Sequence, residues 1–346
     1  MNENLAAAWR KQIDYCDAHG SPFTAHVLAA AWADWIQGGA LRSLMPDWPG
    51  DAWTDVVPLR LAGALHSLAL DGSSAALAAL YPPQAATFDA RRGPSAIAEA
   101  MRAHPERISA YLQSPPQTNE IGRSAVLLGG FAAIAQATGL PLALLEMGAS
   151  AGLNQLWHRY RYELGGLQWG DAASPVLIRS DWHGALPNLP ARIDVAASAA
   201  CDIAPIDLHR PGAGLRLASY VWPDQTERVE RLRAAIDLAR QLGVAVERAD
   251  AGAWVSRQLT AARPGRATVL YHSIMWHYMQ PPLQTALRAT IAAASERATH
   301  EAPLAWLSFE LPDPNSLPEL ALTLWPGGER RVLADAHAHG HYATWR

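Results

Sequence analysis

The chain carries the sequence LLEMGASAGLN at residues 144–154, which begins three residues after Pro141. Residues 141–147 form a short apolar run, which predicts a fully buried strand. The small residues that follow predict a tight loop, and a helix is expected to begin after it. Such a loop lets the backbone approach a ligand closely, and a helix N-terminus favours polar or anionic groups. This segment therefore predicts the first strand, loop and helix of an α/β sheet with a ligand site.

Two enzyme chemistries compete for this loop. In the pattern E-x-G-x-x-x-G, Glu146 accepts hydrogen bonds from a ribose or an amine, and the loop binds S-adenosylmethionine. That cofactor site comprises Glu146, Gly148, Ala149, Ser150, Ala151, Gly152 and Asn154. In the pattern G-x-S-x-G, Ser150 is instead the nucleophile of a hydrolase. The structural alternative is a tight turn whose small residues allow close packing and bind no ligand.

The rest of the chain favours the nucleotide interpretation. Further strand-like runs cover residues 192–197, 244–248, 267–272 and 304–311, with helical segments at 225–242 and 283–294. This alternation predicts a mostly parallel sheet with helices on both faces. A nucleophile elbow normally follows several strands, whereas nothing before residue 141 reads as a strand. Residues 320–325 and 330–337, separated by Pro326-Gly327-Gly328, predict a closing hairpin with a reversed last strand. Residues 163–190 match no pattern.

The first part of the chain reads as helical. Helices are expected at residues 4–18, 22–37, 59–80 and 94–112. Ser114-Pro115-Pro116 then breaks the pattern, so a domain boundary is expected between residues 1–115 and 116–346. A helix is expected at residues 119–138. The uncharged run at 124–145 is interpreted as a buried helix and strand rather than a membrane span.

Composition restricts the class of protein. The chain has 346 residues, of which 50% are hydrophobic and 17% are charged, so it can bury a sizeable core. A net charge of −4 gives no reason to expect nucleic acid or an anionic membrane as a partner. Cys16 and Cys201 form no CxxC pair, and the first residues show no signal pattern. We therefore expect a reduced, cytoplasmic setting.

Acidic residues follow two of the predicted strands. Ligands of such sheets collect at the carboxyl ends of strands near the point where strand order reverses. Asp202 is then expected to bind ribose hydroxyls, and Asp250 and Ala251 are expected to face the adenine. The distance in sequence from Glu146 to Asp202 exceeds the roughly 20 residues of a minimal nucleotide site, which makes Asp202 the weaker assignment.

Two other groups are candidates for the substrate side. Asn119, Glu120 and Arg123 precede a helix and either reach the cleft or form a capped helix start. The second group follows the predicted strands at residues 267–272 and 304–311, and comprises His272, Trp276, Tyr278 and Glu310. His272 is the candidate general base, and the aromatic rings would stack on a planar or cationic group. The alternative for these residues is core packing or pairing with an arginine.

His337, His339 and His341 alternate along the predicted last strand and invite a metal interpretation. No cysteine lies nearby and no fourth ligand is evident, so no metal site is expected. In the hydrolase alternative, Asp335 and His337 would complete a triad with Ser150. An acid and a histidine only two residues apart would be unusual partners in that arrangement.

The loop, the acidic strand ends and the hairpin resemble the Rossmann-like methyltransferases that use S-adenosylmethionine. The motifs TNE-x-GRS at 118–124, VWPDQ at 221–225 and YHS-x-x-W at 271–276, with LLEMGASAGLN, resemble a bacterial family of unknown function, domain of unknown function 2332. This second resemblance covers most of the chain and supports the fold more than the reaction. The resemblance to the methyltransferases implies a Rossmann-like cofactor domain and an S-adenosylmethionine cofactor.

Together these observations predict an S-adenosylmethionine-dependent methyltransferase. Its acceptor is expected to be a small molecule enclosed by the N-terminal helical domain, because such ligands prefer clefts between domains. The alternatives are a serine hydrolase built on Ser150 and a nucleotide-binding protein without turnover. The acceptor and the oligomeric state are left open.

Overall fold

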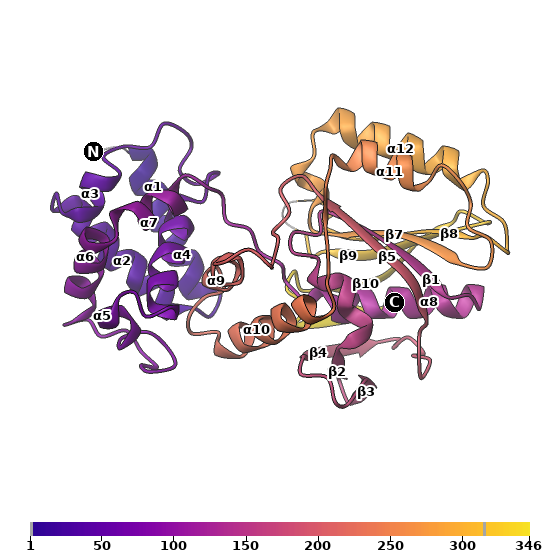
Figure 1. Cartoon of the computed structure of the whole chain (residues 1–346), viewed down its shortest axis with the longest axis horizontal. Coiled ribbons are helices and arrows are strands. Elements are labelled where there is room, and N and C mark those ends of the chain that lie inside the picture. Colours follow the sequence, from indigo (N-terminus) through magenta and orange to yellow (C-terminus); the bar gives the residue numbers. More distant parts are fainter. Residues whose placement is uncertain (1–2, 314–315) are drawn as a thin grey trace. The chain divides into compact units, whose positions relative to one another are not determined.

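The computed structural model describes residues 3–313 and 316–346. The chain divides into two compact units (Figure 1). The helical unit comprises Met1–Thr118 and Arg210–Arg233, and the sheet unit comprises Asn119–His209 and Ala234–Arg346. The expected boundary at residues 115/116 lies just before the end of the first helical segment. The assignment of residues 210–233 to the helical unit was not expected.

The described residues of the helical unit form helices and no strands. They are α1 (Glu3–Ala18), α2 (Pro22–Ile36), α3 (Ala40–Leu44), α4 (Val57–Leu70), α5 (Ala75–Ala78), α6 (Gly93–Ala103), α7 (Pro105–Leu112) and α9 (Ala213–Ser219), and α10 (Thr226–Gln241) begins within it. Two of the expected helices are interrupted. The one expected at 94–112 ends at Ala103, because Pro105 lacks an amide hydrogen and disfavours helical backbone at His104.

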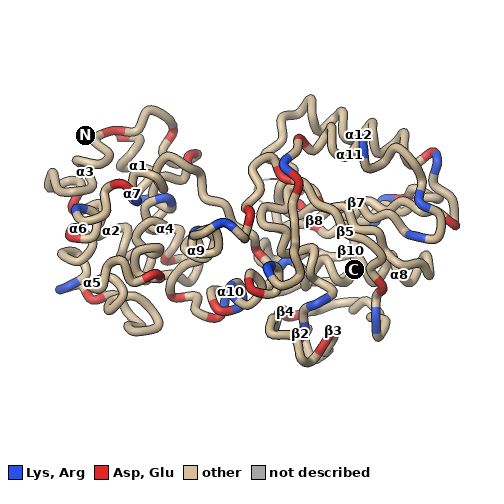
Figure 2. The backbone as a smooth tube through the Cα atoms, viewed as in Figure 1, with Lys and Arg blue, Asp and Glu red and all other residues tan. Residues whose placement is uncertain are grey.

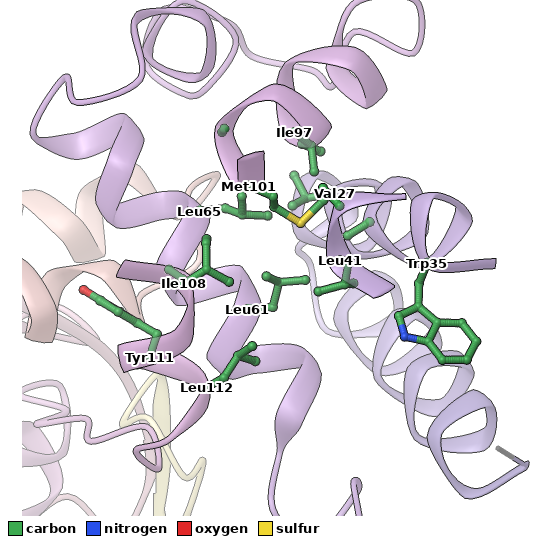
Figure 3. Packing of buried hydrophobic residues seen from close by; sticks show 14 of the residues in the cluster. Val27, Trp35, Leu41, Leu61, Leu65, Ile97, Met101, Ile108, Tyr111 and Leu112 are labelled. Atoms are coloured by element: carbon green, nitrogen blue, oxygen red, sulfur yellow. The ribbon is translucent and has the colours of Figure 1, made fainter. Parts of the chain in front are cut away.

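The helical unit has its own hydrophobic core (Figure 3). Leu61 and Leu65 of α4 point toward Met101 of α6 and Ile108 of α7, and all four are completely or almost completely buried. Trp35 of α2 also donates a hydrogen bond from its indole nitrogen to the Met45 carbonyl oxygen at 2.8 Å. The interlocking of four helices explains why this unit needs no sheet.

Hydrogen bonds explain why residues 210–233 belong to the helical unit. The Asp224 carboxylate accepts a bond from the Ser21 hydroxyl at 2.5 Å and from the Phe23 amide at 3.1 Å. Ser21 makes no side-chain cap to α2 itself, so Asp224 serves the free amide at the start of that helix. Further along, a ring nitrogen of buried His66 lies 3.1 Å from the Ser219 carbonyl oxygen.

The sheet unit contains one sheet in the order β3-β2-β4-β11-β10-β9-β8-β7-β1-β5-β6. Its strands are β1 (Leu142–Met147), β2 (Arg161–Leu164), β3 (Leu167–Gly170), β4 (Leu177–Gly184), β5 (Val195–Asp202), β6 (Glu247–Arg248), β7 (Ala267–Ser273), β8 (Leu304–Glu310), β9 (Glu319–Trp325), β10 (Arg330–Ala336) and β11 (Tyr342–Trp345). Strands β6, β5, β1, β7 and β8 run parallel. The expected α/β class with a large, mostly parallel sheet is therefore confirmed.

The antiparallel end of the sheet confirms the predicted hairpin and adds strands that were not predicted. Strand β9 pairs antiparallel with both β8 and β10. The chain then continues into β11, which pairs antiparallel with β10 and parallel with β4. Residues 163–190, which matched no pattern, contain β3 and β4 and extend this end of the sheet. Two predicted strands have different bounds in the structure. The one predicted at residues 192–197 is β5, which begins later, and the one predicted at 244–248 is β6, which spans only Glu247–Arg248.

Helices cover both faces of the sheet. Helix α8 (Arg123–Thr138) lies on one face, and α11 (Ala251–Gln258) and α12 (Pro281–Ser295) lie on the other (Figure 1). Gly130 brings α8 close to the sheet, because a Cβ atom there would stand 2.5 Å from the Leu307 side chain. The uncharged run at 124–145 thus becomes α8 and β1, as expected. Within the described residues, no helix combines the length and hydrophobicity needed to cross a bilayer.

Charged residues of both signs are interspersed over both units (Figure 2). Helix α10 illustrates this, because Glu227 and Glu230 alternate with Arg228 and Arg231 along its first turns. Such mixing produces no strong field of one sign along this helix.

Removing the Asp224 carboxylate should destabilise the helical unit. Asp224→Ala leaves the Phe23 amide and the Ser21 hydroxyl without this acceptor, at a cost of about 1–3 kcal/mol. Urea denaturation measures the free energy of unfolding. Asp237→Ala is the matched control, since that exposed carboxylate pairs only with Arg240 on its own helix, and its loss should cost ~0.5 kcal/mol or less. Equal losses in the two variants would refute the capping role of Asp224.

Candidate active site

The order of the parallel strands locates a candidate site. Strands β1, β5 and β6 follow one another outward in one direction, whereas β7 and β8 lie on the other side of β1. Strand order therefore reverses between β1 and β7, and open α/β sheets bind ligands outside the carboxyl ends of the strands at that point. Met147 and His272 are register partners there, at the ends of β1 and β7.

Glu146 is the central acidic group at this edge. It is 3% exposed, and its carboxylate accepts a hydrogen bond from the Tyr271 hydroxyl at 3.1 Å. Burial raises the pKa of Glu146 to about 8, although the bond from Tyr271 opposes this rise. A hydrogen-bond donor or a cation beside Glu146 would offset the cost of burying its ionised form.

The loop after β1 has the unusual backbone that a close ligand contact needs. Gly148 and Gly152 have φ values of 66° and 77°, and Ser150, which has a side chain, has a φ of 55°. Positive φ at a non-glycine residue costs of order 1–3 kcal/mol and is found preferentially at functional sites. At Gly148 a Cβ atom would also stand 2.9 Å from the Met275 side chain.

The expected α-helix after the loop is absent. Residues Leu153–Arg159 instead form η1, a 3₁₀ helix of 7 residues. Its first amide, that of Leu153, donates to the Asn119 side-chain oxygen at 2.9 Å, and the Gln155 amide donates to the Gly152 carbonyl. The prediction of an anion-binding helix N-terminus is therefore wrong, because these amides already have partners within the protein and a short 3₁₀ helix has a weak dipole.

Asp202 connects the end of β5 to this loop. Its carboxylate accepts hydrogen bonds from the Ser150 amide and the Ala204 amide, each at 2.8 Å. A carboxylate offers about four acceptor positions, so about two stay available for a ligand. The long sequence separation from Glu146 is explained by β2, β3 and β4, which lie between the two residues in the chain.

Two buried polar atoms lie in the same region without partners among the described residues. They are the Ser150 hydroxyl and the Asn154 side-chain oxygen, in residues that are 8% and 2% exposed. Buried polar groups usually have hydrogen-bond partners, so each requires an explanation. In particular, the structure gives Ser150 no histidine or carboxylate partner of the kind a serine nucleophile needs.

Asp250 and Ala251 have a structural explanation. Asp250 is the N-cap residue of α11, and its side chain accepts a hydrogen bond from the Ala253 amide at 3.0 Å. Ala251 is the first residue of that helix. The Asp250 side chain is exposed, so one of its oxygens can still meet a ligand.

Asn119, Glu120 and Arg123 join this edge to the loop after β10. Glu120 accepts from the Gly122 amide at 2.9 Å and lies 3.2 Å from a ring nitrogen of His339. Arg123 donates to the Ser273 and Ala338 carbonyl oxygens, each at 3.0 Å. The structure thus brings this motif to the carboxyl end of β7. The positive charge of Arg123 also opposes the rise in the pKa of Glu146.

His272 and Glu310 form a buried pair. One ring nitrogen of His272, Nδ1, lies 2.7 Å from Glu310 Oε1, and the other, Nε2, accepts from the Trp306 indole at 3.0 Å. Burial acts to raise the pKa of Glu310, but the hydrogen bonds from His272 and from the Met275 amide outweigh it and lower the pKa. Both nitrogens of His272 are therefore engaged within the protein. This geometry favours a positioning role for His272 over the predicted role of general base.

The two aromatic candidates of this segment differ in their surroundings. The Trp276 ring stacks on His272 with 5.1 Å between ring centres, and the Arg288 guanidinium lies 4.9 Å from its centre. Tyr278 is 77% exposed. Trp276 is therefore packed against the buried pair, whereas Tyr278 projects from the surface.

His337, His339 and His341 lie in the turn between β10 and β11 rather than along a strand as expected. His337 and His341 stack with their ring centres 4.4 Å apart, and His337 Nδ1 accepts the His339 amide. Asp335 pairs with Arg346, which removes it from the hydrolase triad considered for Ser150. Across residues 3–313 and 316–346, no cluster of three or more His, Cys, Asp or Glu suited to a metal is found.

Sequence reasoning missed three residues of this region. They are Tyr271, which bonds Glu146, Trp306, which bonds His272, and Ile274, which has a φ of 48°. Positive φ at a β-branched residue is a genuine outlier. The position of Ile274 directly after a predicted strand was the available signal. Ser150 follows β1 and Ile274 follows β7, so unfavourable backbone lies on both sides of the point where strand order reverses.

Comparison with known proteins adds a family. The family model described as "Uncharacterized protein conserved in bacteria (DUF2332)" matches residues 6–345. No curated protein matches the chain, and neither does any solved structure.

Relief of the backbone at Ser150 should stabilise the protein. Ser150→Gly removes both an unfavourable φ and a buried hydroxyl without a partner, for an expected gain of about 1 kcal/mol. Ser180→Gly is the control, because its hydroxyl is also buried without a partner but its φ is not positive. That strand variant should lose about 0.5–1 kcal/mol. Destabilisation of similar size in both variants would contradict strain at Ser150.

The raised pKa of Glu146 predicts a pH dependence of stability. The folded state retains the proton up to about pH 8, whereas the unfolded state loses it near the ordinary value of 4.5. Stability from this group is therefore present at low pH and is lost as the pH rises toward 8. Relative to Glu146→Gln, the wild type should lose up to ~1.4 kcal/mol per pH unit across that window.

Denaturation at several pH values measures this difference. Glu163→Gln, at a surface ion pair with Arg179, is the control and should follow the wild type. A constant difference between wild type and Glu146→Gln would show that Glu146 titrates normally.

Proposed function

This chain belongs to the bacterial family DUF2332, and we propose that it binds S-adenosylmethionine and transfers its methyl group to a small molecule. The observation that carries the proposal is the set of acceptors at the strand-order reversal. Glu146 and Asp202 end neighbouring parallel strands, and a loop of small residues lies between them in sequence and against them in space. This is the arrangement in which open α/β sheets hold nucleotides.

The residues present suit this cofactor. Its ribose hydroxyls and amino group are hydrogen-bond donors, and Glu146 and the free positions of Asp202 are acceptors. The unpartnered Ser150 hydroxyl and Asn154 oxygen would gain partners from the same ligand. Asp250 has an exposed carboxylate for the adenine amine.

Bound S-adenosylmethionine would supply an electrophilic methyl group on a positively charged sulfur. The chain's own contribution is then mainly positioning, since transfer requires the acceptor to lie in line with that sulfur. His272 and Glu310 serve this end by fixing the turn after β7, because Glu310 also accepts the Met275 amide. Arg123 fixes the same strand end through the Ser273 carbonyl.

Calorimetric titration tests the cofactor. S-adenosylmethionine and S-adenosylhomocysteine should bind the wild type, and Glu146→Ala and Asp202→Ala should each weaken binding tenfold or more, about 1.4 kcal/mol. Glu163→Gln and Asp237→Ala, at surface ion pairs away from these strand ends, should bind as the wild type does.

Two results would overturn the proposal. Folded wild type that binds neither compound would remove the cofactor, and labelling of Ser150 by a serine-directed phosphonate would then support a hydrolase. Binding that is insensitive to Glu146 and Asp202 would mean that the nucleoside site lies elsewhere. Binding without methyl transfer to any acceptor would support a nucleotide-binding protein.

A further inference from the structure

The turn between β10 and β11 lies at the carboxyl edge of the parallel strands. Strand β9 pairs antiparallel with both β8 and β10, so β10 has the same direction as β8. Glu319 of β9 is the register partner of Glu310 at the end of β8 and of Asp335 near the end of β10. Residues 337–341 follow directly and contain three histidines. The proposed function gives this turn no role.

Two glycines bring the turn into close contact with the motif TNE-x-GRS. A Cβ atom at Gly122 would overlap the His339 carbonyl oxygen, and one at Gly340 would overlap the Gly122 carbonyl oxygen. Arg123 donates one hydrogen bond to a carbonyl oxygen of the turn and another to the Ser273 carbonyl oxygen, each at 3.0 Å. The backbone of the turn is therefore held beside the end of β7.

His339 and Glu120 form a pair within this contact. His339 Nδ1 lies 3.2 Å from Glu120 Oε2, and Glu120 Oε1 accepts the Gly122 amide at 2.9 Å. The Glu120 side chain is 5% exposed, whereas the His339 side chain is 41% exposed although its Nδ1 is buried. The exposed part of the ring is therefore the part that carries Nε2. A buried carboxylate facing one ring nitrogen, with the other open, is the arrangement of a histidine base and its orienting acid.

The carboxylate determines which ring nitrogen of His339 can take up a proton. An ionised carboxylate only accepts hydrogen bonds, so it favours the tautomer with hydrogen on Nδ1 and the lone pair on Nε2. Among the described residues Nδ1 makes no regular hydrogen bond, and catalytic hydrogen bonds of this kind often become aligned only when substrate is bound. His339 thus meets a requirement that His272, with both nitrogens engaged, does not.

The pair is also connected to the loop after β1. Asn119, the neighbour of Glu120 in the chain, accepts the Leu153 amide at 2.9 Å. The Asn154 side-chain nitrogen donates to the Glu120 carbonyl oxygen at 3.4 Å, and the unpartnered oxygen of Asn154 belongs to the same amide. The pair therefore lies between the loop proposed to hold the cofactor and the end of β7.

We propose that His339 is the general base of the methyl transfer and that Glu120 orients it, an inference that rests on the proposed function. The acceptor atom bonds to the methyl carbon as the carbon–sulfur bond breaks, and the electron pair of that bond stays on sulfur. The acceptor's proton passes to His339 Nε2 and then to water. The acceptor is therefore a hydroxyl, thiol or amine, which loses a proton on methylation, and not a carboxylate, which has none to lose.

Histidine modification by diethyl pyrocarbonate tests the pair without cofactor or acceptor. The reagent acylates an unprotonated ring nitrogen, and peptide mass spectrometry gives the rate at each histidine. Glu120→Gln keeps the oxygen that accepts the Gly122 amide but places an amide donor beside Nδ1. That donor favours hydrogen on Nε2, so modification of His339 should slow about tenfold, the effect of one hydrogen bond to a charged group.

His300 is the internal control for this modification. It is exposed and precedes the amino end of β8, on the opposite edge of the sheet. Its rate should be the same in wild type and Glu120→Gln, and far-ultraviolet circular dichroism confirms that the variant is folded. An unchanged rate at His339 would overturn the orienting role of Glu120.

Transfer of tritium from [methyl-³H]S-adenosylmethionine to small molecules extracted from bacterial cells tests the base. The labelled product should resist alkali, which cleaves methyl esters but not ethers, thioethers or methylamines. His339→Ala should lower the rate about 100-fold, the usual contribution of a general base, and added imidazole should restore part of it. Glu120→Gln should lower the rate about tenfold or more without imidazole rescue, and His300→Ala should leave it unchanged.

The outcomes separate this inference from the proposed function. If product forms but alkali releases its label, or if His339→Ala transfers methyl at the wild-type rate, His339 is not the base although the methyltransferase stands. If the wild type forms no labelled product, or binds no cofactor in the calorimetric titration, the proposed function fails and the base fails with it.

Discussion

The complete burial of β1 between β5 and β7 is the constraint on which the sheet unit depends. This strand pairs in parallel with β5 on one side and with β7 on the other, and all six of its residues are buried. Leu145 and Met147 face α11 and α12, so Glu146, between them, points to the α8 face. A carboxyl group is thereby almost completely buried, and the rise in its pKa follows from that burial.

The carboxyl ends of β1 and β7 contain groups that destabilise the fold locally, and the surrounding structure compensates for them. Ser150 and Ile274 have unfavourable backbone, and Glu146 is a buried acid, yet β1 and β7, which carry these segments, are each paired on both sides. A sheet that is well packed on both faces can maintain strained backbone and a buried acid. In proteins such groups are found preferentially at sites that bind a ligand. The proposed nucleoside cofactor would meet the acid, the loop and the unpartnered oxygens together, whereas a serine hydrolase would require a base beside Ser150, and the described residues place none there.

The sequence allowed the centre of the sheet to be predicted, but not its far end. Apolar runs mark β1, β7 and β8, and a Pro-Gly-Gly turn marks the hairpin, because these signals are local. Strand β4 mixes Trp182 with polar residues and is completed only by β11, far along the chain. Likewise, Glu146, near the end of one predicted strand, and Asp202, after another, could be chosen as candidates from the sequence. The engagement of both nitrogens of His272 depends on long-range contacts with Trp306 and Glu310, which no local pattern encodes.

The most direct measurement is hydrogen–deuterium exchange of the intact chain with and without S-adenosylhomocysteine. Slower exchange is expected in the ligand's presence for the loop at residues 147–154 and for residues 201–206 at and after the end of β5. These amides are where the loop and Asp202 would contact a nucleoside. Protection confined to the helical unit, or no change at either segment at a concentration that saturates binding, would contradict a nucleoside site at these strand ends.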